Sequence, residues 1–256
     1  MSLARALIVG ATLFGALGAL GATSASAMPS GAWPQPPGRT VASTAMMLSD
    51  APVYASPGAT KAIATARAET SWTGSPAVLL IAASRRDASG RIWLKVMLPI
   101  RPNGSSGWIL ADHAQISTTS ARIEISLRAR KLRLRVAGKI VMTTRTVVGK
   151  RSTPTPRGQF AIYERADSPR GANIGPFALH LTAFSDVLHS YDGGPGRIAI
   201  HGRSGSLLAD PLGSAASHGC VRMSNSTLWR LAKFATPGTP VSIALGWPKL
   251  PAAATR

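Results

Sequence analysis

Acidic side chains are scarce in this sequence of 256 residues. It holds 10 Asp and Glu against 29 Lys and Arg, so the formal net charge at pH 7 is +19. A basic excess of this size favours polyanionic surroundings, such as nucleic acid, an anionic membrane face or an anionic cell wall. Charged residues make up 15% of the chain and hydrophobic residues 45%. That balance argues against extended disorder and supports one large or two small domains.

Long apolar runs are missing after the first 27 residues. Residues 7–21 are apolar, follow the basic Arg5 and lead to small residues that end in Ala25-Ser26-Ala27. This is the layout of a secretory signal peptide, and four glycines in the run weaken it as a membrane-spanning anchor. We therefore predict a signal peptide over 1–27 and an exported protein in the periplasm, cell wall or medium, with no stable membrane span after cleavage. Export removes nucleic acid as a partner.

Cysteine is almost absent, because Cys220 is the only one. An exported chain with one cysteine cannot close an internal disulfide, so this thiol is either free or paired between chains. A free cysteine often serves as a small buried hydrophobe. Its neighbours decide between that interpretation and a functional thiol.

The first half of the chain predicts a linker and a small β-barrel. Residues 28–45 are rich in proline and glycine and indicate an extended linker. Residues 46–116 alternate short apolar segments with turns, a pattern typical of a small barrel. The order of a Trp93 strand, a glycine turn and a Trp108 strand loosely resembles bacterial SH3-like domains. We expect both tryptophans to be buried rather than to form a binding surface, and the domain to act as a wall-binding module or as a spacer.

The second half, residues 119–245, predicts another mainly β domain, followed by a tail over 246–256. Alternating segments at 123–127 and 132–136, the second of which turns at Ala137-Gly138 into 140–141, indicate a β-hairpin with one polar face. Between residues 122 and 151 there are ten basic residues and one acidic residue, Glu124. Such a run is either a solvated strand face or a surface that faces anionic wall polymers.

Two further segments of this half shape the predicted fold. A long, irregular Gly- and Pro-rich connection over 167–196 suggests a functional loop. A single C-terminal helix is expected to begin at a cap on Asn225 or Ser226 and to stop before Pro237.

The polar residues near Cys220 in the sequence are of the types that activate a catalytic thiol. His201 lies nineteen residues earlier, after the short apolar segment 198–200, and His218 lies two residues before the cysteine. Either imidazole can activate a thiol, and an adjacent imidazolium is expected to bring the pKa of Cys220 well below the usual value of about 8.5. On an extended strand His218, Cys220 and Arg222 point to one face. Gly219 allows close approach of a substrate, the amides around it can stabilise an oxyanion, and Arg222 suits a substrate carboxylate.

Zinc binding is the main alternative chemistry for these residues. His201, His218 and Cys220 can supply three ligands, with His180 or His189 as a fourth. Their spacing matches none of the common zinc patterns, and a coordinated thiolate is not free to attack a substrate. A structural role for both histidines remains the plain alternative.

The segment His201-Gly202 followed by Ser217-His218-Gly219-Cys220-Val221-Arg222-Met223 closely resembles the signature of the L,D-transpeptidase family (YkuD-type catalytic domain). In that family a His-Gly precedes a Ser-His-Gly-Cys-x-Arg segment. The resemblance extends over residues 119–245 and includes Thr153-Pro154-Thr155-Pro156-x-Gly158-x-Phe160.

This resemblance implies a β-sandwich catalytic domain with one C-terminal helix, behind the SH3-like barrel. It implies cross-linking of peptidoglycan stem peptides, with a tetrapeptide donor and an amine acceptor, through a cysteine thioester and without metal or organic cofactor. Carried over, Cys220 is the nucleophile, His201 the base and acid, and His218 and Gly219 frame the oxyanion. Gly202 orients His201, and Arg222 and Ser217 belong to the substrate side.

Two other functions remain open at this point. Water can replace the amine acceptor, which gives an L,D-carboxypeptidase or endopeptidase of the same fold. A wall-binding protein without catalysis is the second alternative, and the intact Cys220, His201 and Arg222 argue against it.

Overall fold

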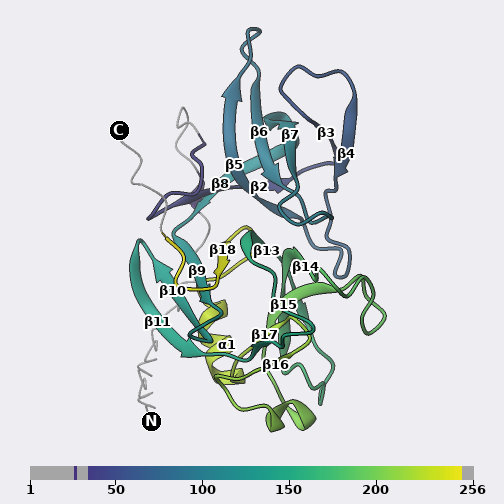
Figure 1. Ribbon diagram of the computed structural model, residues 1–256. Helices are drawn as coiled ribbons and strands as arrows, with labels where there is room; N and C mark the ends of the chain where they lie inside the picture. The colour runs from purple at the N-terminus through teal and green to yellow at the C-terminus, as the bar shows by residue number, and fades with distance from the viewer. Residues whose placement is uncertain (1–25, 28–33, 250–256) are drawn as a thin grey trace, which may run out of the picture.

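The computed structural model describes residues 26–27 and 34–249, which form two β-rich units, one above the other in Figure 1. These described residues are mainly β with a single α-helix, as the sequence predicts. The predicted signal peptide lies outside the described residues, apart from strand β1 (Ser26–Ala27), which pairs with β8. Over 26–27 and 34–249 no helix is long and apolar enough to cross a bilayer.

The upper unit is one eight-stranded sheet in the order β1-β8-β2-β5-β6-β7-β3-β4. Its pairings are antiparallel, and the short strands predicted from residue 53 to residue 109 fall on β3, β5, β6 and β7. An SH3-like barrel stays a prediction. The strands after β1 are β2 (Ala42–Met47), β3 (Ala51–Tyr54), β4 (Ala62–Ala66), β5 (Val78–Arg86), β6 (Ile92–Met97), β7 (Ser106–Leu110) and β8 (Ala114–Thr119).

The start of β2 and the burial of Trp108 differ from the sequence predictions, whereas the burial of Trp93 agrees. Strand β2 begins at Ala42, inside the segment predicted as linker, because it pairs with both β5 and β8 and its residues are largely buried. Trp93 is buried as expected, and its Nε1 donates a hydrogen bond of 2.8 Å to Asp87. Trp108 is half-buried, with the guanidinium of Arg85 5.9 Å from its ring.

The lower unit is a second eight-stranded sheet, in the order β11-β10-β9-β18-β13-β14-β15-β17. The predicted hairpin is confirmed, with positive φ at Ala137 and Gly138 in its two-residue turn. The strands are β9 (Ala121–Ser126), β10 (Lys131–Val136), β11 (Lys139–Arg145), β13 (Gly158–Asp167), β14 (Phe177–Phe184), β15 (Arg197–His201), β17 (Val221–Arg222) and β18 (Pro240–Ala244), with β12 (Val148–Gly149) and β16 (Ala215–Ser217) as a separate pair.

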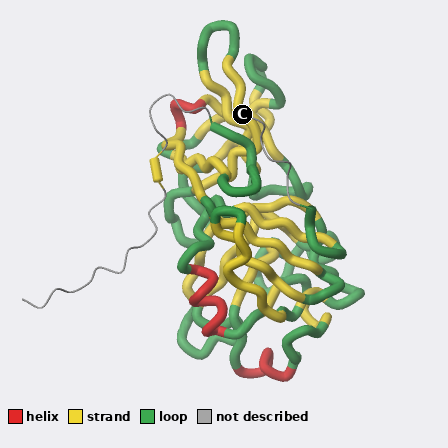
Figure 2. The backbone as a smooth tube through the Cα atoms, turned by 90° about the vertical axis from the view of Figure 1, so that its left-hand side faces the viewer, coloured by secondary structure: helices red, strands yellow, loops and turns green. Residues whose placement is uncertain are grey.

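Helix α1 (Asn225–Ala232) lies alongside the lower strands, where it is the longer of the two red helices in the lower half of Figure 2. Leu228 and Leu231 are fully buried in the lower core. The helix cap differs from the prediction by one residue, because the Ser224 hydroxyl accepts the N–H of Thr227. The Asn225 side chain instead accepts the backbone N–H of Arg203, so it fastens the turn after β15 to the helix.

The polar face predicted for the first hairpin strand is not solvated. Arg122 and Glu124 on β9 are 4% and 1% exposed. Glu124 pairs with Arg135 on β10 at 2.7 Å, and Arg122 donates to the carbonyl oxygen of Gly38. Charged groups are tolerated inside a protein when each has a partner. The alternation of apolar and polar residues on β9 therefore corresponds to a strand buried on both faces, not to one with a solvent-exposed face.

The connection predicted as irregular over 167–196 contains strand β14. This strand pairs with β13 on one side and β15 on the other, and its residues are buried except His180, which is half-buried. What remains irregular is the loop before β14 and the loop after it. We call residues 185–196, between β14 and β15, the cover loop.

The two units pack through β13 and its neighbours. Tyr163 on β13 belongs to the hydrophobic cluster of the upper unit. The Thr182 hydroxyl on β14 donates to the sulfur of Met97 on β6, at 3.2 Å. The connection from β4 to β5 descends to the neighbourhood of β14 (Figure 1), which brings upper residues close to the lower sheet.

Candidate active site

A cleft of about 430 Å³ opens at the end of the lower sheet next to Cys220. Residues from far apart in the sequence line it. Five of its polar residues were singled out from the sequence: Cys220, His201, His218, Arg222 and the zinc candidate His180. Tyr191, Trp72 and Arg197 were not. The cleft therefore gathers a thiol, three imidazoles, two guanidiniums and two further aromatic rings.

Parallel pairing of β15 and β17 brings the predicted catalytic residues together. His201 ends β15 and lies opposite Arg222 in the register, with Ile200 opposite Val221. Cys220 immediately precedes β17, so continuing this register by one residue places it beside Ala199. Side chains two residues apart on an extended strand share a face, which places Cys220 and Arg222 on the face that His201 also uses.

His201 is held as a neutral ring by a backbone carbonyl. Its Nδ1 lies 2.7 Å from the carbonyl oxygen of Gly202. Because a carbonyl only accepts hydrogen bonds, Nδ1 carries the proton and the lone pair of the neutral ring is on Nε2. Burial lowers the pKa of His201 to about 4, against the opposing effects of hydrogen bonds to the backbone of Gly202 and Ile174. The ring is thus uncharged at neutral pH and can accept a proton at Nε2.

Cys220 is a thiol rather than a thiolate in this environment. Burial raises the pKa of Cys220, while contact with the Ala199 backbone and the charge of Arg222 act in the opposite direction. An imidazolium next to the sulfur would lower this pKa, but His201 is neutral. The site therefore pairs a neutral thiol with a neutral base, and the proton must leave the sulfur as the attack proceeds.

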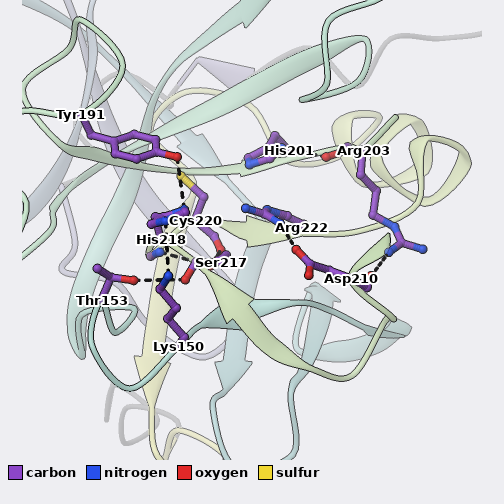
Figure 3. Close-up of polar contacts among 12 residues, drawn as sticks. Lys150, Thr153, Tyr191, His201, Arg203, Asp210, Ser217, His218, Cys220 and Arg222 are labelled. Atoms are coloured by element: carbon purple, nitrogen blue, oxygen red, sulfur yellow. Dashed lines mark hydrogen bonds and ion pairs between the residues drawn. The ribbon is translucent and has the colours of Figure 1, made fainter. Parts of the chain in front are cut away.

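His218 is occupied at both ring nitrogens. Its Nε2 accepts from the ammonium of Lys150 at 3.4 Å, which leaves the proton on Nδ1 for a 3.2 Å hydrogen bond to the Tyr191 hydroxyl. Figure 3 shows this chain from Lys150 through His218 to Tyr191 beside Cys220. Desolvation first, and then the charge of Lys150, lower the pKa of His218. Both of its ring nitrogens are therefore engaged by residues other than the thiol.

Arg222 is almost fully buried and tied to an acid. Its Nη1 donates to Asp210 at 2.6 Å, and the side chain of Arg222 is 7% exposed. Asp210 is itself fixed, since its carbonyl oxygen accepts from the guanidinium of Arg203. The Nε of Arg222 has no partner among the described residues. The guanidinium is thus oriented by Asp210 and retains donors for another anionic group in the cleft.

The turn before Cys220 differs from the sequence expectation in two respects. Ser217 is fully buried and does not line the cleft, so the expected substrate contact is absent. Its hydroxyl donates to the Cys220 carbonyl oxygen and accepts the Gly219 N–H at 3.1 Å. The Gly219 amide is therefore committed to the turn and not free for an oxyanion. Gly219 is required for another reason, its φ of +124° and the nearness of Ile198.

The Thr-Pro segment after β12 holds this turn from behind. The Thr155 hydroxyl donates to the Gly219 carbonyl oxygen at 2.7 Å and accepts the Gly149 N–H at 2.9 Å. The Thr153 hydroxyl donates to the Ser217 carbonyl oxygen. Both threonines are buried. They convert a flexible glycine turn into a fixed support for Cys220.

Thr155→Val is therefore expected to slow acylation of Cys220 about tenfold. The variant keeps the shape of the side chain but leaves the Gly219 carbonyl and the Gly149 N–H unpaired, and an unpaired buried polar group destabilises the folded turn by about 1–3 kcal/mol. Thr155→Ser retains the hydroxyl and should stay near wild type. Thr143→Val, on the exposed face of β11, is the matched control. The rate of carbapenem acylation of Cys220, followed by intact mass, measures the effect. An unchanged rate in Thr155→Val contradicts this role.

Several residues of the site were missed from the sequence. Asp210 lies in the loop between His201 and Cys220, and Tyr191 lies in the cover loop; neither belongs to the motif around the cysteine. Trp72 comes from the upper unit and is 46% exposed at the cleft. The Tyr-Asp-Gly-Gly turn was a local signal for Tyr191, whereas nothing near Trp72 in the sequence links it to the cysteine.

The described residues contain no group of three or more His, Cys, Asp or Glu side chains able to hold a metal ion. His180, one of the candidate zinc ligands, instead stacks on Trp72 with ring centroids 4.1 Å apart. Burial lowers the pKa of His180 to about 4, so it too is neutral.

Comparison with known proteins identifies the family of the lower unit. The sequence profile of the L,D-transpeptidase catalytic domain (YkuD) matches residues 120–243. A Bacillus licheniformis protein, provisionally named L,D-transpeptidase YkuD, is 32% identical over 163 residues, which is 61% of this chain and 89% of that protein. The Bacillus subtilis protein of the same name is 31% identical over 126 residues, 49% of this chain and 67% of that protein.

Solved structures were compared as well. A mutant of the Enterococcus faecium L,D-transpeptidase has 21% sequence identity and a TM-score of 0.35, and the match covers 48% of this chain and 49% of that one. This chain thus spans about half the length of that protein.

Proposed function

Because this chain belongs to the L,D-transpeptidase (YkuD) family, we propose that it cross-links peptidoglycan stem peptides through a thioester on Cys220. The family assignment supports an enzyme that acts on peptidoglycan. The thioester, the residue roles and the acceptor are the parts that we propose.

One observation carries the proposal more than any other. The only thiol of the chain lies in a cleft with a histidine whose Nδ1 is bound to the Gly202 carbonyl oxygen, which leaves the lone pair of the neutral ring on Nε2. This is the arrangement that a nucleophile and its base require, because the third group fixes the tautomer of the base. A buried structural cysteine needs neither an oriented imidazole nor a cleft.

In the first step the Cys220 sulfur attacks the carbonyl carbon of the L-centre residue in a donor tetrapeptide. His201 Nε2 takes the thiol proton as the carbon–sulfur bond forms. The bond from that carbon to the nitrogen of the terminal D-alanine then breaks, and His201 returns the proton to this nitrogen. Free D-alanine leaves, and the acyl group stays on Cys220 as a thioester.

In the second step an amine of another stem peptide attacks the thioester carbon. His201 accepts a proton from this amine, the new amide bond forms, and the carbon–sulfur bond breaks. The proton passes to the sulfur, so the resting thiol and neutral imidazole are restored. The cycle is redox-neutral and is complete with the groups of the cleft and the two peptides.

We assign Arg222 to the donor side of the cleft. Its guanidinium is oriented by Asp210 and is suited to a substrate carboxylate. His218 and Tyr191, which are linked by a hydrogen bond, form the opposite wall. The thioester lies between them in this arrangement.

Incubation of the purified protein with a tetrapeptide donor, with and without an amine acceptor, tests the proposal. We expect loss of D-alanine and a matching mass increase on the protein, followed by a cross-linked dimer when amine is present. By family resemblance, a carbapenem should also add its mass at Cys220. Release of free tripeptide at the same rate with or without amine favours the carboxypeptidase alternative. Failure to acylate at all contradicts the proposal and favours a non-catalytic wall-binding protein.

We place the mature protein outside the cytoplasmic membrane, where its substrate occurs. The signal-like residues 1–27 and the net charge of +19 both fit an anionic cell wall as the surroundings.

A further inference from the structure

The cover loop forms one wall of the cleft and has few fixed points of its own. Tyr191 exchanges two backbone hydrogen bonds with Gly194, and the Ser185 hydroxyl accepts the N–H groups of Val187 and Leu188. These contacts shape two turns but do not attach the loop to the sheet. Even so, the loop must be held in place for Tyr191 to meet His218.

Two side chains of the upper unit supply that attachment. Arg101, in the connection from β6 to β7, donates to the carbonyl oxygens of Ser185, Leu188 and Pro195 at 2.8, 3.2 and 3.1 Å. A guanidinium suits this task because its donors are fixed in one plane. Its carbon also lies 4.9 Å from the centre of the Phe184 ring.

Asn103 holds the start of the same loop. Its amide nitrogen donates to the Phe184 carbonyl oxygen at 2.7 Å and to Asp186 at 2.9 Å, while its oxygen accepts the Phe184 N–H at 2.8 Å. Arg101 and Asn103 therefore make six hydrogen bonds across the two units. Backbone groups of a surface loop otherwise turn to water, so these bonds select one position of the loop.

Trp72 contributes a wall of the cleft directly. It stands in the connection from β4 to β5, stacks on His180, and lies under the guanidinium of Arg197 at 5.4 Å. Next to it, the backbone N–H and hydroxyl of Thr73 donate to the buried Glu164 at 3.3 and 3.1 Å. The indole is thus fixed, yet 46% of Trp72 remains exposed. A rigid, half-exposed aromatic face in a cleft is suited to contact with a ligand.

We propose that the upper unit completes the active site, with Trp72 as a wall that contacts the stem peptide and with Arg101 and Asn103 as positioning residues for the cover loop. This inference rests on the proposed function. It also changes the expectation drawn from the sequence, because residues 119–245 then hold the reacting groups but not the whole binding site. Binding of the stem peptide, rather than the reaction of the thiol, depends on the upper unit.

Kinetics of tetrapeptide turnover in the full chain test the role of Trp72. We expect Trp72→Ala to raise KM about tenfold and to leave kcat within about twofold, because binding contact is lost away from the reacting atoms. Trp72→Phe should recover most of the affinity. Trp247→Ala, which removes a tryptophan stacked on Arg133 outside the cleft, is the matched control. Wild-type KM in Trp72→Ala overturns this part of the inference.

The positioning role needs a measurement that does not depend on turnover. Nuclear magnetic resonance titration of the His218 ring provides it, since desolvation is the main cause of its lowered pKa and Tyr191 of the cover loop packs on the ring with centroids 5.1 Å apart. Release of the loop in Arg101→Ala or Asn103→Ala should raise the His218 pKa toward the ordinary value and speed iodoacetamide alkylation of Cys220. Arg67→Ala, an exposed arginine of the same unit, should change neither. An unchanged His218 pKa in both variants overturns the positioning role.

These readouts separate this inference from the proposed function. If the wild type does not turn over tetrapeptide, protection of Cys220 from iodoacetamide by the peptide still measures binding. If the wild type has no turnover but the peptide protects its Cys220, and Trp72→Ala loses this protection, the proposed transpeptidase function is refuted and the binding role of Trp72 is supported. If the wild type turns over tetrapeptide and the variants behave like it, the proposed function is supported and the role of the upper unit is refuted.

Discussion

Cys220→Ser is expected to abolish tetrapeptide turnover and carbapenem acylation while it leaves the fold intact. Serine retains the size of the side chain, but an alcohol holds its proton far more tightly than a thiol. His201, with a pKa of about 4, is a weak base and cannot compensate for this difference. The measurement is release of D-alanine together with intact protein mass. Turnover in Cys220→Ser at a tenth of the wild-type rate or more contradicts a thioester mechanism.

The control for this variant is binding without chemistry. Cys220 is partly exposed in the cleft, so the loss of one sulfur should change thermal stability little. Saturation of Cys220→Ser by tetrapeptide, followed by calorimetry, should match that of wild type. Since the chain has no other cysteine, every thiol-specific mass shift in the wild type reports on this position alone.

The lower sheet could be predicted from local patterns. The hairpin at residues 137–138 follows from alternation and a turn that needs positive φ, and helix α1 follows from apolar periodicity and a cap. Strand β14 was not recognised, because it is buried on both faces and carries His180 and Thr182 among its apolar residues. Periodicity of two is a signal of half-buried strands, so a central strand of this composition does not display it.

The catalytic part of the site was also accessible to sequence reasoning. His201 and Cys220 line one cleft, next to the parallel pairing of β15 with β17, and the family signature marks both. The protonation states were not accessible. A low thiol pKa was the natural expectation beside a histidine, yet burial of His201 keeps it neutral and removes the positive charge that would stabilise a thiolate. Burial is a property of the packed fold, which no short motif encodes.

The contribution of the upper unit lies furthest from what the sequence reveals. Arg101 and Trp72 are more than a hundred residues from Cys220, and neither stands in a recognisable motif. Their meaning depends on how two sheets pack at β13, which is decided by shape and by buried groups such as Tyr163. Contacts of this kind between units follow no local periodicity.

His201→Ala is expected to lower the rate of Cys220 acylation on the order of a hundredfold at pH 7, the usual contribution of a general base. In the wild type the free base form of His201 is already present above its pKa of about 4. The rate should therefore be nearly flat from about pH 5 to 8 and fall at lower pH. Without the base only the thiolate reacts, and its pKa is raised, so the His201→Ala rate should climb about tenfold per pH unit across that range.

The same pH profile in His218→Ala decides which imidazole serves the thiol. Because both nitrogens of His218 are engaged by Lys150 and Tyr191, its removal should lower the rate but preserve the flat profile between about pH 5 and 8. Carbapenem acylation followed by stopped-flow absorbance measures all three proteins in one buffer series. If His218→Ala acquires the steep profile and His201→Ala keeps the flat one, His218 is the base. The Nδ1 contact of His201 with Gly202 would then be structural, because a fixed tautomer has catalytic value only on the ring that exchanges the proton.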